Sequence, residues 1–305
     1  MKTAFLFPGQ GSQYIGMGND IFQGCRIAQD IYKTVSDVSG IDIAATSFLG
    51  HPDRLKESQN AQLATLTMSL AVFHAMTMRG INPDLIAGHS MGEYSAIIAA
   101  KGMEIEEGIV LIRRRGCLMS KKDMKSEGAM AAVSGLPLQE IEATLCEKDA
   151  VCIANYNTPS QFVLSGEKSC LYARTALLKE KGAKIIFLPV GGAFHSPLMR
   201  DASTAFHEFL KEVQVKDLSY PLIGNVKASL ISKSSEVMEE MKSHMLSPVR
   251  WYDTVKKMLD MGIMRFVEIG PGHVLKGLML RIHRKAEVFT TGSLMELENT
   301  IEKLS

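Results

Sequence analysis

The sequence lacks the features that mark secreted, membrane and zinc-binding proteins. Its 305 residues hold only five cysteines, which are scattered and form no C-x-x-C pair. No apolar run approaches the roughly eighteen residues that a membrane span needs. The apolar start of the chain is interrupted at Pro8 and Gly9, too early for a signal-peptide core. We therefore expect a soluble, cytoplasmic protein with reduced thiols, and neither a metal nor a redox cofactor.

An excess of charge of either sign is also missing. The formal net charge is +1 and the sequence pI is about 7.7, so nothing global favours nucleic acid or an anionic membrane as a partner. An acidic partner would have to meet a local basic patch, and each candidate patch taken alone is more often a solvated surface. The candidates are Arg113–Arg115, Lys121 and Lys122 with Lys125, and Arg281 with Arg284 and Lys285.

What the sequence does contain is an apolar content of 46%, enough to bury a large core. Residues 3–7 and 84–88 have the short apolar pattern of buried strands, and residues 63–80 and 91–102 have helical spacing. This order predicts a parallel sheet covered by helices on both faces. The pattern resumes after Pro189, with helices expected at 196–213, 251–262 and 274–283, strands at 220–226 and 265–270, and a closing segment at 287–292.

The middle of the chain follows a different order. Strands are expected at 129–136, 150–157, 161–166 and 184–190, and helices at 138–148 and 170–182. The resulting βαββαβ order is that of a ferredoxin-like unit. We therefore predict an α/β fold in which a hydrolase-like, parallel-sheet large domain (1–125 and 191–305) carries an inserted ferredoxin-like small domain (126–190).

A candidate nucleophile stands where the second strand ends. Residues 88–92, GHSMG, fit G-x-S-x-G, in which a serine sits on a tight strand-to-helix turn with its hydroxyl exposed. The five-residue match is weak by itself, and a glycine-flanked structural turn is the alternative. The apolar strand before it and the helix after it favour Ser90 as a nucleophile, with the helix N-terminus directed at a developing oxyanion.

A serine needs a base, and histidine is the usual one at neutral pH. Among the eight histidines, His195 lies in the Gly-rich loop "GGAFHSPLM" between an apolar strand and a helix, where open α/β sheets hold their sites. His244 and His273 are competitors. His89 adjoins the serine but would point away from it, and the others stand at expected surface or helix-flank positions.

Together these segments resemble a known family. The segments "FPGQGSQ", "GHSMGEYSA", "RRRG" followed by "GAMAAVSGL", "ANYNTPSQFVLSG", "AFHSPLM", "NV", "SPVRW" and "EIGPGHVL" occur in the order seen in malonyl-CoA:acyl-carrier-protein transacylases and the related acyltransferase domains of polyketide synthases. The resemblance covers essentially the whole chain. It implies a hydrolase-like α/β large domain with a ferredoxin-like insertion.

The resemblance also implies roles for individual residues. Ser90 matches the nucleophile and His195 the general base, while Gln10 matches the residue whose backbone N–H joins that of Met91 in the oxyanion hole. Arg115 matches the arginine that pairs with the free carboxylate of the substrate, as a bidentate guanidinium can. Phe194, directly before the base, matches the malonyl rather than the methylmalonyl pattern.

Three further positions border the expected site. His244 stands where the family commonly has a glutamine whose backbone carbonyl orients the base. The change could therefore be silent, or the second imidazole could shift the pKa of His195 or compete for its hydrogen bond. Gln62 matches the family. Asn157 matches a position at the acyl pocket, although a hairpin-capping role is at least as good an explanation.

The resemblance implies transfer of a malonyl group from malonyl-CoA to the phosphopantetheine thiol of acyl carrier protein, by a ping-pong route through O-malonyl-serine. The motifs do not separate fatty-acid from polyketide synthesis or fix the oligomeric state, and a monomer is the simplest expectation. Two alternatives remain open: a serine thioesterase or acyl hydrolase of related fold, and a non-catalytic subunit that docks acyl carrier protein.

Overall fold

The computed structural model describes residues 1–120, 127–145 and 150–305. Its larger sheet has six strands in the order β10-β9-β1-β2-β7-β8. All neighbours in it are parallel except the β7–β8 pair. The strands are β1 (Thr3–Phe7), β2 (Leu85–Gly88), β7 (Leu222–Ile223), β8 (Leu230–Ile231), β9 (Arg265–Glu268) and β10 (Glu287–Thr290). The predicted parallel sheet is confirmed.

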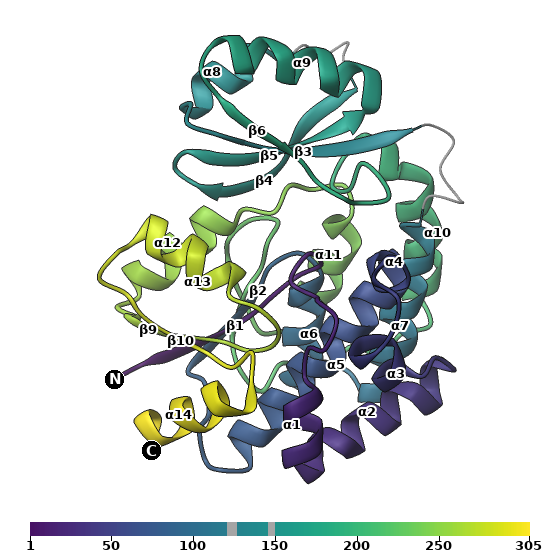
Figure 1. Cartoon of the computed structure of the whole chain (residues 1–305), viewed down its shortest axis with the longest axis vertical. Coiled ribbons are helices and arrows are strands. Elements are labelled where there is room, and N and C mark those ends of the chain that lie inside the picture. Colours follow the sequence, from purple (N-terminus) through teal and green to yellow (C-terminus); the bar gives the residue numbers. More distant parts are fainter. Residues whose placement is uncertain (121–126, 146–149) are drawn as a thin grey trace.

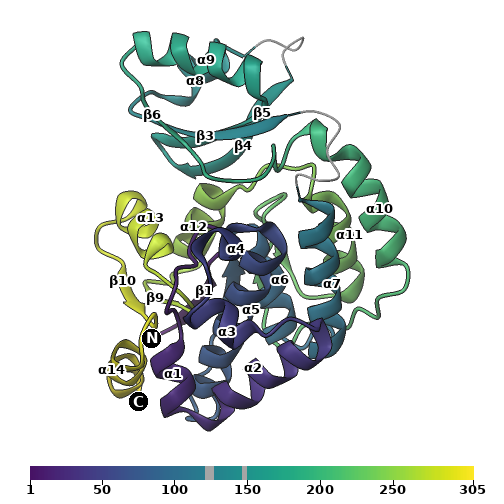
Figure 2. The same ribbon diagram turned by 45° about the vertical axis from the view of Figure 1, so that its right-hand side comes forward.

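Helices cover both faces of this sheet (Figures 1 and 2). Phe5 and Phe7 of β1 pack into one core, and Ala4 and Leu6 pack into a second core on the opposite face, as the two-residue period of a strand requires. The first core is closed by α2 (Arg26–Ser39), α5 (Ser58–Thr77), α6 (Met91–Ala99) and α7 (Ile105–Leu118), and the second by α12 (Trp251–Asp260) and α13 (Val274–Ile282).

The smaller sheet is antiparallel and lies beyond the carboxyl ends of β1 and β2 in the larger sheet (Figure 1). Its order is β4-β5-β3-β6, and with two helices it has its own apolar core. The elements are β3 (Gly128–Ser134), α8 (Leu138–Glu142), β4 (Val151–Thr158), β5 (Gln161–Glu167), α9 (Lys168–Glu180) and β6 (Lys184–Phe187). This βαββαβ order is the predicted one, whereas the domain boundaries at 125/126 and 190/191 stay predictions because residues 121–126 are outside the described part.

Several elements differ from the sequence prediction. The helix expected at 138–148 ends at Glu142, and residues 146–149 are not described. The helix expected at 196–213 is a 3₁₀ turn, η2 (Pro197–Met199), followed by α10 (Arg200–Leu210). Seven helices were not expected from the sequence: α1 (Asn19–Gly24), α2, α3 (Ile43–Phe48), α4 (Pro52–Lys56), α7, α11 (Ser234–His244) and α14 (Leu294–Leu304).

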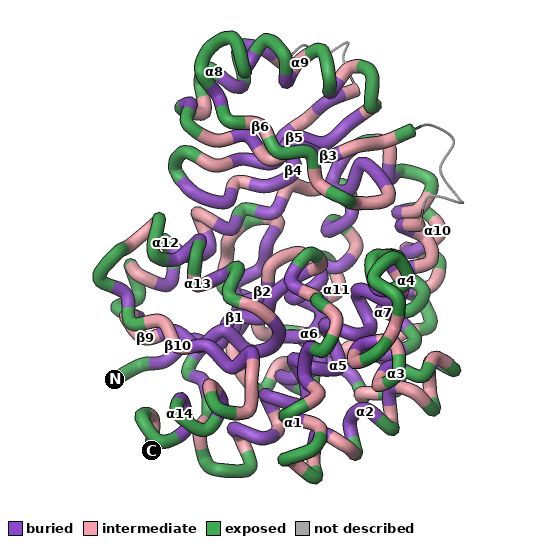
Figure 3. The backbone as a smooth tube through the Cα atoms, in the orientation of Figure 1, coloured by how far each residue is buried: buried purple, intermediate pink, exposed green. Residues whose placement is uncertain are grey.

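Buried residues are concentrated inside the molecule, where helices pack against the sheets, and exposed residues lie on its outer surface (Figure 3). β1 and β2 are buried along their whole length, so their carboxyl ends meet at a protected edge that faces the smaller sheet. Within the described residues, no helix is both long and apolar enough to cross a membrane.

Candidate active site

Ser90 occupies the sharp turn between β2 and α6. Its backbone has φ 51° and ψ −115°, a conformation that non-glycine residues rarely adopt. The flanking glycines are required by space, because a Cβ at Gly88 would lie 2.1 Å from the Glu93 amide nitrogen and one at Gly92 would lie 2.0 Å from the Phe7 carbonyl oxygen. The turn is thus the strained serine elbow that the G-x-S-x-G pattern predicts.

His195 reaches Ser90 from the loop before η2. Ser90 Oγ lies 2.8 Å from His195 Nε2, and His195 Nδ1 lies 2.9 Å from the Ser247 carbonyl oxygen and 3.1 Å from that of His244. The two carbonyls can only accept, so Nδ1 carries the proton and Nε2 is free to accept the serine proton. The Nδ1 side of His195 is therefore held by backbone carbonyls rather than by a carboxylate.

Burial keeps the imidazole neutral. His195 is 4% exposed, and desolvation, with the nearby Arg115 charge, lowers its pKa from 6.5 to about 3. A base that is unprotonated at neutral pH can take a proton from Ser90 without first losing one.

The turn after β1 lies beside the elbow. β1 and β2 pair in register through Phe7 and Gly88, and the His89 amide donates to the Phe7 carbonyl at 2.9 Å. Gly9 packs on the His89 carbonyl so closely that a Cβ there would lie 2.3 Å from its oxygen. Met91 is the first residue of α6, so its amide has no intrahelical acceptor. Gln10 and Met91 therefore stand at the same sheet edge, as the oxyanion-hole prediction requires.

A chain of side chains links Gln10 to Arg115. Gln62 Nε2 donates to Gln10 Oε1 at 3.2 Å, and Arg115 Nη1 donates to Gln62 Oε1 at 2.8 Å. Arg115, in the last turn of α7, is 1% exposed, and its Nε and Nη2 have no hydrogen-bond partner among the described residues. These two atoms share one edge of the guanidinium, which is the edge suited to bidentate binding of a carboxylate.

Arg115 and His244 meet on the ring of Tyr94. The Arg115 guanidinium carbon lies 5.0 Å from the centre of that ring, and the His244 ring lies 5.1 Å from the Tyr94 ring and 5.4 Å from the His195 ring, centre to centre. Neither nitrogen of His244 has a partner in the described part of the chain. Burial, together with the Arg115 charge, holds the pKa of His244 well below its usual range. His244 thus contributes both a carbonyl that accepts from His195 Nδ1 and a neutral ring.

His89 points away from Ser90, as predicted. Its Nε2 lies 2.9 Å from Asn157 Oδ1, and its ring lies 5.5 Å from that of Trp251. Because Asn157 belongs to β4, this contact joins the elbow to the smaller sheet. Asn157 therefore has a partner across the two sheets in addition to its place near the hairpin.

The remaining predicted residues separate into buried and exposed groups. Phe194 is 6% exposed and belongs to the larger core, whereas Arg113, Arg114, Arg281, Arg284 and Lys285 are exposed. His273 pairs with Glu296 in an exposed contact, so it does not compete for Ser90. Lys121, Lys122 and Lys125 lie outside the described residues.

Asn225 makes a contact with the Ser90 turn that the sequence did not predict. The side chain of Asn225, after β7, accepts from the Ser90 amide at 2.8 Å and donates to the Gly88 carbonyl at 2.7 Å. Asn225 stands in the "NV" segment that carries part of the resemblance, but no chemical signal distinguished it there.

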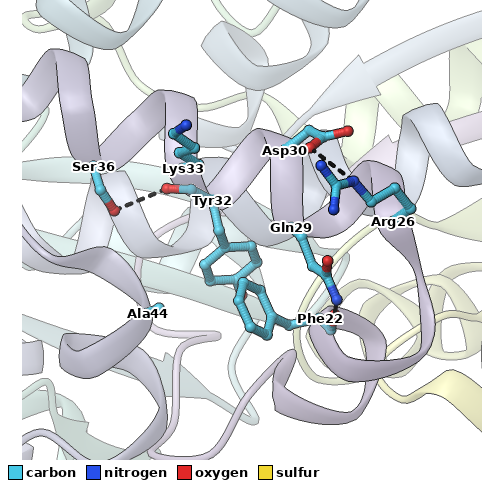
Figure 4. Close-up of a pocket in the computed structure, with 8 residues that line it drawn as sticks. All are labelled: Phe22, Arg26, Gln29, Asp30, Tyr32, Lys33, Ser36 and Ala44. Atoms are coloured by element: carbon cyan, nitrogen blue, oxygen red, sulfur yellow. Dashed lines mark hydrogen bonds and ion pairs between the residues drawn. The ribbon is translucent and has the colours of Figure 1, made fainter.

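No other feature of the described residues rivals this site. They hold no group of three or more His, Cys, Asp or Glu side chains that could bind a metal. A hollow of about 300 Å³ beside α2, bordered by Phe22, Tyr32 and Ala44, contains none of the predicted site residues (Figure 4).

Comparison with known proteins agrees with this fold. Residues 4–292 match the model of the acyl transferase domain family, and the chain belongs to that family. It is similar to the malonyl CoA-acyl carrier protein transacylase of Bacillus subtilis (strain 168), with 36% identity over 99% of this chain and 97% of the relative.

Solved structures give the same result. The malonyl CoA-acyl carrier protein transacylase of Coxiella burnetii has a TM-score of 0.95 and 31% identity, covering 100% of this chain and 98% of that one. A malonyl-transacylase solved in complex with its type II polyketide synthase acyl-carrier protein has a TM-score of 0.96 and 30% identity, covering 99% of this chain and 100% of that one.

Proposed function

We propose that this protein transfers a malonyl group from malonyl-CoA to the phosphopantetheine thiol of an acyl carrier protein. The observation that carries the proposal is the buried Arg115 edge without a partner, next to the Ser90–His195 pair. A buried guanidinium without an ion pair is costly to desolvate, and a site that chose acetyl groups would have no use for its unbonded Nε and Nη2 edge. A substrate carboxylate supplies the missing charge.

In the first half-reaction, His195 Nε2 takes the proton of Ser90 Oγ as that oxygen attacks the thioester carbonyl. The backbone amides of Gln10 and Met91 donate to the oxyanion of the tetrahedral intermediate. The intermediate collapses, the C–S bond breaks, and His195 returns the proton to the departing CoA thiolate. The product is O-malonyl-Ser90.

The second half-reaction reverses these roles. The phosphopantetheine thiol gives its proton to His195, and its sulfur attacks the ester carbonyl of O-malonyl-Ser90. When the C–O bond breaks, the proton returns to Ser90 Oγ and the malonyl thioester leaves on the carrier protein. No metal or redox cofactor has a part in this sequence.

Arg115 selects the substrate by donating hydrogen bonds from Nε and Nη2 to its carboxylate. The Gln62 side chain is hydrogen-bonded to both Arg115 Nη1 and the Gln10 side chain. It thereby aligns the guanidinium with the loop whose Gln10 backbone N–H donates to the oxyanion. Phe194 lines the acyl pocket and disfavours a 2-methyl group, a discrimination of about 1–3 kcal/mol. His89 and Asn157 brace the elbow against the smaller sheet.

The partner is an acidic carrier protein, for which the exposed clusters Arg113–Arg114 and Arg281 with Arg284 and Lys285 are candidate contacts. The acyl product supplies extender units for fatty-acid or polyketide synthesis. The reaction takes place in the cytoplasm, where thiols such as Cys25 and Cys117, which form no disulfide, stay reduced. We retain two domains, 1–125 with 191–305 and 126–190, and a monomer as working proposals.

The test is a transfer assay with malonyl-CoA and a holo acyl carrier protein, in which the malonylated carrier and free malonate are both measured. We expect malonyl-carrier formation and little malonate. Malonate formed at the same rate with and without carrier would favour an acyl hydrolase. Carrier binding without any acyl adduct would favour a docking subunit.

A further inference from the structure

Asn225 contacts the nucleophile's own peptide groups. Its side-chain amide bridges the Gly88 carbonyl and the Ser90 amide, the two groups on either side of His89. Backbone pairing between β2 and β7 ends at Ala87 with Ile223, so the Asn225 side chain continues the ladder beyond its last residue pair. It satisfies two backbone groups at the point where Ser90 adopts its unusual φ.

Asn225 is itself held firmly. The backbone N–H of Asn225 donates to Glu93 Oε2 at 2.7 Å, and its backbone carbonyl accepts from the Arg250 N–H at 3.0 Å. The backbone N–H of the next residue, Val226, donates to Glu240 Oε1 at 2.6 Å. Asn225 is 1% exposed, and Glu93 and Glu240 are also buried. The loop carrying Asn225 is therefore fastened to α6 and α11.

The two carboxyl groups lie close together, because Glu93 accepts from the Asn225 backbone amide and Glu240 from that of Val226, the next residue. A second negative charge is disfavoured beside the first in a buried site. Burial raises the pKa of both, against the lowering effect of Arg115 on Glu93 and of Lys227 on Glu240. The pair can thus hold Asn225 and Val226 while carrying a single negative charge.

We propose that Asn225 is a positioning residue for the nucleophile: its side-chain amide fixes the elbow that presents Ser90 to His195, and Glu93 and Glu240 fix Asn225. It contacts neither the substrate nor the reacting atoms. The proposal rests on Ser90 being the nucleophile of the proposed transfer. Loss of the Asn225 side-chain amide should therefore lower the rate of Ser90 acylation and leave the apparent affinity for malonyl-CoA nearly unchanged.

The experiment compares Asn225→Ala, Asn225→Asp and the matched control Ser229→Ala, which changes a hydroxyl on the same loop. Two rates are measured at pH 6 and pH 8: malonyl loading by rapid quench and intact mass, and labelling of Ser90 by a fluorophosphonate probe that needs no malonyl site. We expect Asn225→Ala to slow both rates about 100-fold and Ser229→Ala to leave them unchanged.

Asn225→Asp tests the donor separately. At pH 8 the introduced carboxylate can accept from the Ser90 amide but cannot donate to the Gly88 carbonyl, so both rates should fall as in Asn225→Ala. Burial and the neighbouring Glu93 and Glu240 raise the pKa of that carboxyl, against the lowering effect of the Arg115 charge. At pH 6 its protonated form donates again, and we expect at least a tenfold recovery, which a loss of packing alone would not give.

The outcomes separate the two proposals. Wild-type protein that labels with the probe but does not load malonyl would overturn the proposed function and leave the positioning role to be judged by probe labelling. Rates for Asn225→Ala and Asn225→Asp equal to wild type, or an Asn225→Asp rate that is equally low at both pH values, would overturn the positioning role. If Asn225→Ala does not fold, the pH dependence of Asn225→Asp decides alone.

A second variant pair tests the support from α6. In Glu93→Gln the side-chain oxygen still accepts from the Asn225 backbone amide, so loading should stay within about twofold of wild type. Glu93→Ala removes this bond and should slow loading at least tenfold. Equal loading by both variants would contradict the assigned support.

Discussion

Replacing Arg115 with methionine removes the guanidinium while keeping most of the side-chain volume. In the proposed complex, two charge-assisted hydrogen bonds to the malonyl carboxylate disappear. Each is worth about 1.5–3 kcal/mol, so malonyl loading should fall by roughly 10²–10⁴-fold. Acetyl loading has no carboxylate to lose and should stay equal or rise, because the site then presents an apolar group to the methyl.

The same substitution should cost little stability. Arg115 is fully buried without an ion pair to any described residue, and desolvation lowers its pKa. Removing such a charge relieves its desolvation and offsets the loss of the Gln62 bond. We expect the free energy of unfolding to stay within about 1 kcal/mol of wild type.

The assay measures single-turnover loading from malonyl-CoA and from acetyl-CoA, together with chemical denaturation. The control is Arg114→Met, an exposed change one position earlier on α7. Equal losses with both acyl donors would refute the carboxylate role of Arg115. So would a variant that unfolds readily yet keeps the wild-type preference for malonyl.

Three other predictions follow from the same contacts. Because the pKa of His195 is about 3, kcat/KM for loading should show no acid limb between pH 5 and 8, and a limb near pH 6.5 would contradict this. The lowered pKa of His244 means that the unfolded chain, but not the folded one, takes up a proton below about pH 6.5. Acid therefore destabilises the fold. Between pH 7 and pH 5, the free energy of unfolding of His244→Gln should fall by about 1–2 kcal/mol less than that of wild type in denaturant titrations. An identical fall in both proteins would refute this prediction. Asn157→Ala leaves the buried His89 Nε2 unpaired and should lower the free energy of unfolding by about 1–3 kcal/mol; no change would contradict the link between the sheets.

The sequence was sufficient for the features that local pattern encodes. The strands β1 and β2 are short apolar runs, and the elbow glycines are required by contacts within the same strand-turn-helix unit, so the position of Ser90 could be predicted. The βαββαβ order of the smaller sheet was predictable for the same reason, because each element keeps its own periodicity. The charge pattern alone grouped Arg113–Arg115 as one surface patch, and this is wrong for Arg115, which is buried while Arg113 and Arg114 are exposed.

Features that depend on distant segments could not be predicted from local pattern. His195 is oriented by the carbonyls of His244 and Ser247, and every residue has a carbonyl, so the sequence carries no signal for them beyond the resemblance. Asn225 reaches Ser90 across 135 positions, and an asparagine after a two-residue strand looks like any turn residue. The edge of Arg115 without a partner is visible only once burial is known.

The most direct test of the account is to locate the acyl group after brief incubation of the protein with malonyl-CoA alone. Intact mass and peptide mapping should find one malonyl group, on Ser90, that is absent in Ser90→Ala and disappears when holo acyl carrier protein is added. A malonyl group on another residue, or rapid transfer to the carrier without any adduct on Ser90, would contradict the Ser90–His195 mechanism.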